Sequence, residues 1–362
     1  MSILQIFLIS LSSLLLAPDR ESVDIVFAGD AMQHQRQLDA ARRADGTYDY
    51  SPYYREIKPY IESADYAVVN LETPLGGAPY SGYPMFCAPD SYLTALTDAG
   101  FDLILTANNH MLDRRDRGLR RTVATLESAG VPYVGAYRNK AHRDSVIPVI
   151  KDIGGFKVAF LNYTYGTNGI AIQGDVVADY INRPLMKEDV EKSRAKGAEI
   201  VVVCVHWGEE YKLLPNAAQR SLADYLTDLG VDLIIGGHPH VIQPMEIRRS
   251  EKHDKDVFLC YSLGNFVSAM RTTDTRGGAL ARVTLARDSI GRAVVRDASY
   301  RMVFTVPPGG GNRDFYLIPA EKVAPAHINQ AREAFVRNAM RIFNAHNAGV
   351  PLDTLSISAY DR

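Results

Sequence analysis

The sequence predicts an α/β fold in which a sheet is covered by helices on both faces. Apolar strand-like runs alternate with helical segments over most of the chain. One of these runs, residues 199–205, is an almost unbroken series of β-branched residues, which is typical of a strand buried on both faces. Residues able to bind metals follow five of the runs directly, and open α/β sheets carry their sites at the C-terminal ends of strands. The pattern therefore predicts the fold class and the position of the site together.

The first half of the chain contains strands that alternate with helices. The helices expected at residues 89–99 and 117–128 are followed by Gly100 and Gly130, as is common at helix C-termini. Residues 75–86 form a loop rich in glycine, proline and tyrosine. The other elements expected here are strands at residues 22–28, 66–71, 101–106 and 131–135, and a helix at 54–63.

The second half repeats this alternation and then changes to an antiparallel pattern. Residues 305–314 contain two prolines and three consecutive glycines, which is the best candidate for a domain boundary. We therefore expect a main domain at 21–304 and a C-terminal extension at 305–362 whose helix packs on it. The expected elements are strands at 156–163, 199–205, 231–235 and 256–262, paired strands at 278–286 and 292–304, and helices at 187–196, 217–229 and 327–344.

Composition narrows the function classes. A chain of 362 residues with 46% hydrophobic content can bury a large core. The net charge of −2 shows no basic excess, so nucleic acid is not an expected partner. The three cysteines fit neither a disulfide framework nor a cysteine-based zinc site by their spacing. Cys204 and Cys260 lie in apolar runs and are interpreted as buried thiols.

The N-terminus indicates export. Residues 3–17 are almost wholly apolar, and Pro18-Asp19-Arg20 ends the run, which is too short to span a membrane comfortably. It resembles a secretory signal peptide with cleavage after Ala17, although no Lys or Arg precedes the apolar part. The alternative is a packed N-terminal helix. We expect residues 1–20 to be removed and the mature protein to be periplasmic, on the cell surface or extracellular.

Two histidines one residue apart follow the run at 231–235. Gly236 and Gly237 let the backbone turn, and Pro239 stiffens the loop that carries His238 and His240. Imidazole is the commonest metal-ligating side chain near neutral pH. Taken alone, the pair is equally well explained as two exposed loop histidines.

The other strand ends make the metal interpretation the stronger one. Carboxylates, an amide and imidazoles form the mixed oxygen and nitrogen set that divalent transition ions prefer. Two such ions about 3.5–4 Å apart can share a bridging carboxylate and activate a water molecule. Singly, each residue also fits a helix cap, a turn or a solvated loop. The strand-end residues are Asp30, Glu72, Asn109, His110, His206, His238 and His240.

The order of these motifs resembles the CapA family of poly-γ-glutamate capsule synthesis proteins, a branch of the calcineurin-like metallophosphoesterases. The resemblance covers residues 23–268 and rests on the ordered set rather than on any single motif. It implies a four-layer α-β-β-α sandwich and two divalent metal ions of manganese, iron or zinc. The motifs are Gly29-Asp30, Asn70-Leu71-Glu72, Asn108-Asn109-His110 with Asp113, His206-Trp207-Gly208, Gly237-His238-Pro239-His240 and Tyr261-Ser262-Leu263-Gly264-Asn265-Phe266.

The resemblance also implies a role for each matching position. Asp30 and His240 would bind the first metal, and Glu72 stands at the bridging position. His110 would protonate the leaving group, with Asp113 orienting it. The second metal would be completed by Asn109, His206 and His238.

Two positions depart from the superfamily pattern. Met32 stands where a histidine is common, and Glu72 stands where the bridging residue is usually an aspartate. His34 is a candidate to replace the missing histidine as an additional ligand, or to contact substrate. Arg114 and Tyr83, in loops after strands, are weaker candidates for substrate contacts, and a solvated helix start or simple packing explains them as well.

Two functions remain open from the sequence. The first is an exported hydrolase that cleaves a phosphoester or amide bond in an anionic polymer or its precursor, during capsule or poly-γ-glutamate production. The second is a metal-binding protein without turnover that binds the polymer and assists a membrane synthase. The motif Asn109-His110 favours the first function, and Met32 with Glu72 favours the second.

Overall fold

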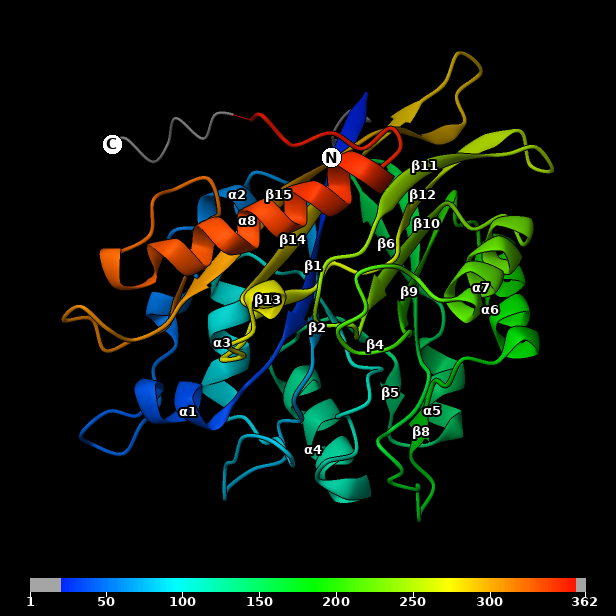
Figure 1. Cartoon of the computed structure of the whole chain (residues 1–362). Helices are drawn as coiled ribbons and strands as arrows, with labels where there is room; N and C mark the ends of the chain where they lie inside the picture. Colours follow the sequence, from blue (N-terminus) through cyan, green and yellow to red (C-terminus); the bar gives the residue numbers. More distant parts are fainter. Residues whose placement is uncertain (1–20, 356–362) are drawn as a thin grey trace, which may run out of the picture.

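Two β-sheets face each other in the computed structural model, and helices cover the outer face of each sheet (Figure 1). The structure describes residues 21–355, so the expected signal peptide at 1–20 lies outside the described residues. None of the described helices has the length and apolar character needed to cross a membrane. The layers are helix, sheet, sheet, helix, as the resemblance implied.

The first sheet has eight strands and mixes parallel with antiparallel pairs. Its central strand β1 pairs in parallel with β2 on one side and antiparallel with β14 on the other. The path runs β16-β15-β14-β1-β2-β3-β4, and β13 pairs with the end of β1. The strands are β1 (Ser22–Ala31), β2 (Tyr66–Leu71), β3 (Leu103–Leu105), β4 (Tyr133–Val134), β13 (Asn265–Val267), β14 (Gly277–Arg287), β15 (Ala293–Val306) and β16 (Tyr316–Pro319).

The second sheet has six strands in the order β11-β12-β10-β9-β7-β6. Its four central strands are parallel, and both edge strands are antiparallel. A separate short pair joins β5 (Ala136–Tyr137) to β8 (Val177–Ala178). The six strands are β6 (Val149–Ile153), β7 (Phe156–Thr164), β9 (Ile200–His206), β10 (Leu233–Gly237), β11 (Met245–Ser250) and β12 (Lys255–Cys260).

The helices form the two outer layers. Those of the first half, α2 to α4, pack on the first sheet, and α6 with α7 packs on the second, at the right of Figure 1. Two single turns of 3₁₀ helix, η1 (Ser51–Tyr53) and η2 (Thr273–Thr275), lie in connections. The α-helices are α1 (Gln35–Ala41), α2 (Lys58–Glu62), α3 (Asp90–Asp98), α4 (Arg115–Ser128), α5 (Lys140–Val146), α6 (Arg183–Ala195), α7 (Ala217–Asp228) and α8 (Ala326–His346).

Strand β1 shows why the apolar runs in the sequence are almost unbroken. Ile25 and Phe27 face the core between the sheets, whereas Val26 and Ala28 face the helices of the first layer. Successive side chains of a strand point to opposite faces, so a strand buried on both faces needs apolar residues at every position. This double burial places β1 at the centre of the molecule.

The predicted helix at 54–63 is shorter in the structure. Only Lys58–Glu62 forms α2, and a 3₁₀ turn precedes it. Pro59 lies in the first turn of α2, where its fixed φ is favourable and its missing N–H is not needed, so the helix starts at Lys58 rather than four residues earlier. The strand predicted at 131–135 is likewise reduced to Tyr133–Val134.

The chain after residue 304 continues the first sheet. Strand β15 runs to Val306, and β16 pairs antiparallel with it beyond the glycine-rich loop. Helix α8 packs on β15, where the rings of Phe343 and Tyr300 are 4.2 Å apart between centroids. The C-terminal extension therefore supplies both an edge strand and a covering helix.

Candidate metal centre

The C-terminal ends of the central strands meet at one place. Asp30 ends β1, Glu72 follows β2, and His206 ends β9. Asn109 and His110 follow β3, while His238 and His240 follow β10. All seven side chains predicted from the strand ends are buried, each 4% exposed or less. The structure thus brings the whole predicted set into one buried cluster, which we call the metal centre.

Short distances connect the two sheets across this centre. His240 Nδ1 lies 3.3 Å from Asp30 Oδ2, and His240 Nε2 lies 3.8 Å from Glu72 Oε1. His206 Nε2 lies 2.8 Å from Asn109 Oδ1 and 3.5 Å from Glu72 Oε1. Imidazoles of the second sheet therefore face carboxylates and an amide of the first.

A β-bulge aims Asp30 into the centre. The register of β1 with β2 shifts between Ala28 and Asp30, and the Asp30 N–H donates to the carbonyl of Gly264 at 3.0 Å. A Cβ on Gly29 would lie 2.0 Å from that carbonyl oxygen, so only glycine allows the close approach. Bulges re-aim side chains next to active sites in this way.

The two loop histidines are held in a strained backbone conformation. His238 has φ of 97° and His240 has φ of 58°, both in the region that favours glycine. The His238 N–H donates to Asp30 Oδ2 at 3.2 Å, which fixes the loop against the first sheet. Strain of this kind persists where surrounding contacts impose it, commonly at functional sites.

The donor atoms form two overlapping groups of metal-ligand type, one of Asp30, Glu72 and His206, the other of Glu72, His238 and His240. Within each group the donor atoms lie within 4.8 Å of one another. Glu72 belongs to both groups, as a bridging carboxylate would. Both of its oxygens are buried without a hydrogen-bond partner, and so is Nδ1 of His238. Buried polar atoms are rarely left unpaired. These oxygen and nitrogen atoms without hydrogen-bond partners are of the kind that bind divalent metal ions.

The electrostatics of the centre agree with this fit. Burial and the charge of Asp30 raise the pKa of Glu72 well above its usual value. Burial lowers the pKa of His206 to about 3 and that of His238 to about 2, so both imidazoles are neutral and have a free lone pair. Burial acts in the same direction on His240, but the charge of Glu72 and the hydrogen bond with Asp30 raise its pKa to about 9. A bound divalent cation would take the place of the protons on Glu72 and His240, because metal ligands must be deprotonated.

Asp30 remains ionised in this setting. Burial raises the pKa of Asp30, but the hydrogen bond with His240 and the charges of His206 and His240 outweigh it and hold the pKa well below the usual value. Asn70 Nδ2 donates to Asp30 Oδ1 at 2.8 Å and supports the charged form further.

His110 stands beside the ligand groups rather than within them. Its Nδ1 lies 2.8 Å from Asp113 Oδ2, which also accepts the Phe86 N–H at 2.7 Å. The Phe86 ring packs edge-on against the imidazole at 4.6 Å. Two side chains therefore fix the orientation of this histidine, with Asp113 in the position that the resemblance implied.

Three asparagines support the centre and received no role from the sequence. Asn70 links Asp30 to Asn108, whose Nδ2 donates to Asn70 Oδ1 at 3.1 Å. Asn265 Oδ1 lies 3.1 Å from His240 Nδ1. All three belong to the motifs that carry the resemblance. Their amide side chains next to the ligand residues were the signal in the sequence that could have identified this supporting role.

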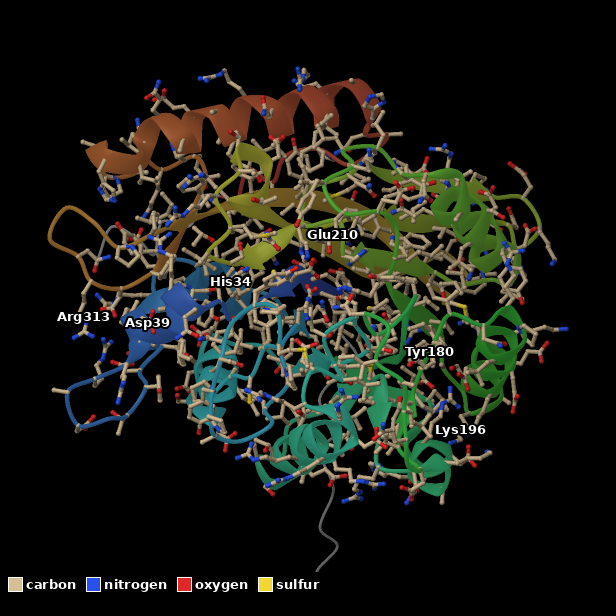
Figure 2. All side chains as sticks on the ribbon, turned by 60° about the horizontal axis from the view of Figure 1, so that its bottom comes forward. His34, Asp39, Tyr180, Lys196, Glu210 and Arg313 are labelled. Atoms are coloured by element: carbon tan, nitrogen blue, oxygen red, sulfur yellow. The ribbon has the colours of Figure 1, made fainter. Side chains whose placement is uncertain are left out.

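His34 lies at the rim of the centre. It caps α1, its Nδ1 lies 3.3 Å from Gln37 Oε1, and its ring packs on Phe86 at 5.2 Å. Within residues 21–355 it joins neither ligand group. Figure 2 shows His34 and Glu210 near the middle of the molecule, with Lys196 at the periphery. Burial and the nearby charges of His240 and His110 lower the pKa of His34 to about 4, although the Gln37 hydrogen bond opposes this.

The weaker candidates divide into structural and exposed residues. Arg114 donates to the carbonyl of Pro79 at 2.8 Å and to Ser81 Oγ at 2.7 Å, so it holds the loop at 75–86. Tyr83 is 73% exposed. Tyr165 lies closer to the metal centre, with its ring 4.5 Å from that of His238. Of these residues, Tyr165 is the one placed to contact a ligand there.

The fold and the site together define the class of protein. Two facing sheets with outer helices form a four-layer sandwich of calcineurin-like fold, and the C-terminal ends of its strands carry a histidine-carboxylate cluster of metal-ligand type. Within that class the chain belongs to the family of bacterial capsule synthesis proteins, PGA_cap, whose sequence pattern matches residues 24–270. The resemblance found in the sequence motifs is thereby confirmed.

Relatives in this family are associated with capsule and poly-γ-glutamate biosynthesis. The chain is 31% identical over 278 residues to the capsule biosynthesis protein CapA of Bacillus anthracis, and covers 65% of that protein with 74% of its own length. It is 29% identical over 276 residues to the PGA biosynthesis protein CapA of Bacillus subtilis. That match covers 68% of the B. subtilis protein and 74% of this chain. The chain thus spans about two thirds of each relative.

A solved structure with a similar arrangement is the NAD nucleotidase NadN of Haemophilus influenzae. The TM-score is 0.49 and the identity is 10%, with 94% of this chain and 58% of the nucleotidase covered.

Proposed function

We propose that the protein is an exported metal-dependent hydrolase that acts on an anionic polymer or its precursor in capsule or poly-γ-glutamate production. The observation that carries the proposal is Glu72, which is shared by two ligand groups and has both oxygens unpaired. A pair of divalent ions bound there would supply a nucleophilic water and stabilise charge on the reacting group. The family relatives support the biosynthetic setting.

The residues of the chain would divide the remaining work. In the two groups that the structure forms, Asp30 and His206 would hold one ion and His238 and His240 the other, with Glu72 shared by both. Asn109 Oδ1 faces His206 at 2.8 Å. His110 has Nδ1 engaged by Asp113, so proton transfer to a leaving group falls to its Nε2. The Tyr165 ring, 46% exposed beside His238, is placed at the entrance.

A screen of hydrolysis on the metal-loaded protein tests this function. Manganese, iron and zinc forms would be assayed against a generic phosphodiester, a phosphomonoester and γ-linked glutamate oligomers. We expect turnover of one bond type that requires metal and falls with His110→Ala. Metal-loaded protein that cleaves none of these substrates would contradict the hydrolase.

Binding without turnover is the second candidate, and it has its own structural support. Met32 is buried at the position where a histidine ligand is common, and its carbonyl accepts from Gln37 and Tyr92. His34 has its Nδ1 beside Gln37 and the Ala269 N–H, and among the described residues it joins neither ligand group. A protein that binds metal and polymer without cleavage, and co-purifies with a membrane synthase, would establish this alternative.

Export rests on the apolar run at residues 3–17. We expect the mature chain outside the cytoplasm, starting near residue 18. Cell fractionation with N-terminal sequencing tests this, and uncleaved full-length chain in the cytoplasm would contradict it.

A further inference from the structure

Three arginines line a cavity at the connection between β13 and β14. The cavity measures about 270 Å³ and is lined by Arg36 of α1 and by Arg271 and Arg276 of the connection between β13 and β14. Among the ion pairs of residues 21–355, none involves these three side chains. We call this cavity the arginine pocket.

The missing counter-charge distinguishes Arg276 from the buried arginines Arg143 and Arg282. Arg143 is buried and pairs with Asp179 and Asp189, and Arg282 is buried and pairs with Asp24. At Arg276, by contrast, burial lowers the pKa and the charges of Arg271 and Arg36 lower it further. Desolvated cations are normally paired, so the partly buried Arg276, with two further cations near it, indicates an anion supplied from outside the chain.

A buried hydroxyl without a partner belongs to the lining of the same cavity. Thr305 lines the pocket and is 4% exposed, and its hydroxyl has no hydrogen-bond partner. A buried hydroxyl that is left unpaired destabilises the protein. Arg276 is held in place because its Nε donates to the carbonyl of Arg271 at 2.8 Å. The rest of its guanidinium group is then available to a ligand.

We propose that the arginine pocket binds an oxyanion group, a carboxylate or a phosphate, of a polyanionic ligand, with the Thr305 hydroxyl completing its hydrogen bonds. The cavity has room for one such group rather than for a whole large ligand. Arg36 and Arg271 are exposed, so the ligand chain can continue into solvent. Three positive charges at one point favour a ligand with several negative charges over a monovalent ion.

One loop connects the pocket to the metal centre. Asn265 Oδ1 contacts His240, and Asn265 Nδ2 donates to Ser268 Oγ at 3.1 Å and to the carbonyl of Thr275 at 2.9 Å. Asn265 therefore joins His240 to the segment 268–276, and residues 268–271 and 276 of that segment line the pocket. That the bound polyanion is the substrate rests on the proposed function, whereas the binding itself does not.

Binding titrations on the metal-loaded protein test the pocket. The probes are a glutamate oligomer and inorganic phosphate, with sodium chloride at equal ionic strength as reference. We expect saturable binding of at least one probe, weakened about tenfold or more in Arg276→Gln and in Arg36→Gln. The matched control is Arg341→Gln, an exposed charge on α8, which should bind like wild type. Metal content should be equal in all four proteins.

Thr305→Val separates a ligand-binding role from a structural one. The change removes a buried unpaired hydroxyl at nearly constant shape, so the ligand-free protein should be at least as stable as wild type while probe binding weakens. The glutamate oligomer binding more tightly than phosphate would assign a carboxylate polymer, and the reverse order a phosphate-bearing ligand. Two results would overturn the proposal. One is that neither probe binds more tightly than chloride, and the other is that the affinity for the probes is unchanged in all three pocket variants. Because turnover is not measured, a failed hydrolase assay leaves this result intact.

Discussion

His110 and Asn109 are neighbours in sequence but differ in what they contact. Asn109 Oδ1 faces the His206 imidazole within the metal centre, at 2.8 Å. His110 is turned to Asp113 and is packed by Phe86. The backbone between β3 and α4 therefore aims one side chain into the metal centre and turns the next one to Asp113.

This separation predicts different effects for two alanine variants. His110→Ala should retain wild-type metal content and lower the turnover by about 10²–10⁴-fold, because general acid catalysis typically contributes that much. Asn109→Ala should lose metal, since it removes an oxygen donor. Metal analysis and kinetics on both variants test the assignment. Loss of metal from His110→Ala would make His110 a ligand instead.

At the scale of elements, the strand ends carry the site because glycines let them approach closely. A Cβ on Gly236 of β10 would lie 2.1 Å from the carbonyl oxygen of Tyr261 and 2.5 Å from Nε1 of Trp207. These atoms are joined by a hydrogen bond of 2.8 Å from the indole to the carbonyl, which connects the end of β9 to the end of β12 across β10. The packing of the second sheet thus depends on the absence of a side chain at this position.

Gly236→Ala should destabilise the protein by about 1–3 kcal/mol, the usual cost of overpacking a core. Gly166→Ala is the matched control, because a Cβ there meets no atom within 4 Å. Urea denaturation of both variants measures the difference. If Gly236→Ala is as stable as Gly166→Ala, the end of β10 accommodates the added methyl group without loss of stability, and the prediction is wrong.

The elements differed in how far the sequence could predict them. The strands β1, β7 and β9 were predicted within a few residues. Because they are buried on both faces, nearly every one of their positions is apolar, and such a run is visible in the sequence itself. Strand β13 has only three residues and exists through pairing with Asp30 and Ala31, which no local pattern shows. Strand β11 was missed because the residues at its centre are charged or only half-buried at an edge.

The residues of the site also divide into those that the sequence could predict and those that it could not. Ligands at strand ends were predictable because parallel strands end at one edge of a sheet. The supporting role of Asn265 was not, since it depends on which face of a short strand meets His240. The arginine pocket joins residue 36 to residues 271, 276 and 305, and no local spacing relates them.

On the scale of the whole molecule, the metal centre lies between the two sheets and connects them. Asp30 and Glu72 come from the first sheet, while His206 and His240 come from the second. Ions bound there would join the halves, so the folded state should gain stability by mass action. Chelation should lower the free energy of unfolding by about 2.7 kcal/mol or more when the free metal is a hundredfold above its dissociation constant.

Urea denaturation with and without chelator measures this coupling. Glu72→Gln provides the control, because it keeps the shape but removes the shared charge, and its stability should not respond to chelator. A wild-type protein equally stable in both conditions would show that the sheets are held together without metal.

The central claim is that Glu72 bridges two divalent ions, and metal stoichiometry tests it most directly. Purified wild-type protein and Glu72→Gln would be loaded with manganese, iron or zinc, desalted and analysed for metal and protein together. We predict about two ions per wild-type chain and a loss of both from Glu72→Gln, because each ligand group contains this residue. A wild-type chain that retains none of the metals, or a variant that retains both ions, would contradict the account.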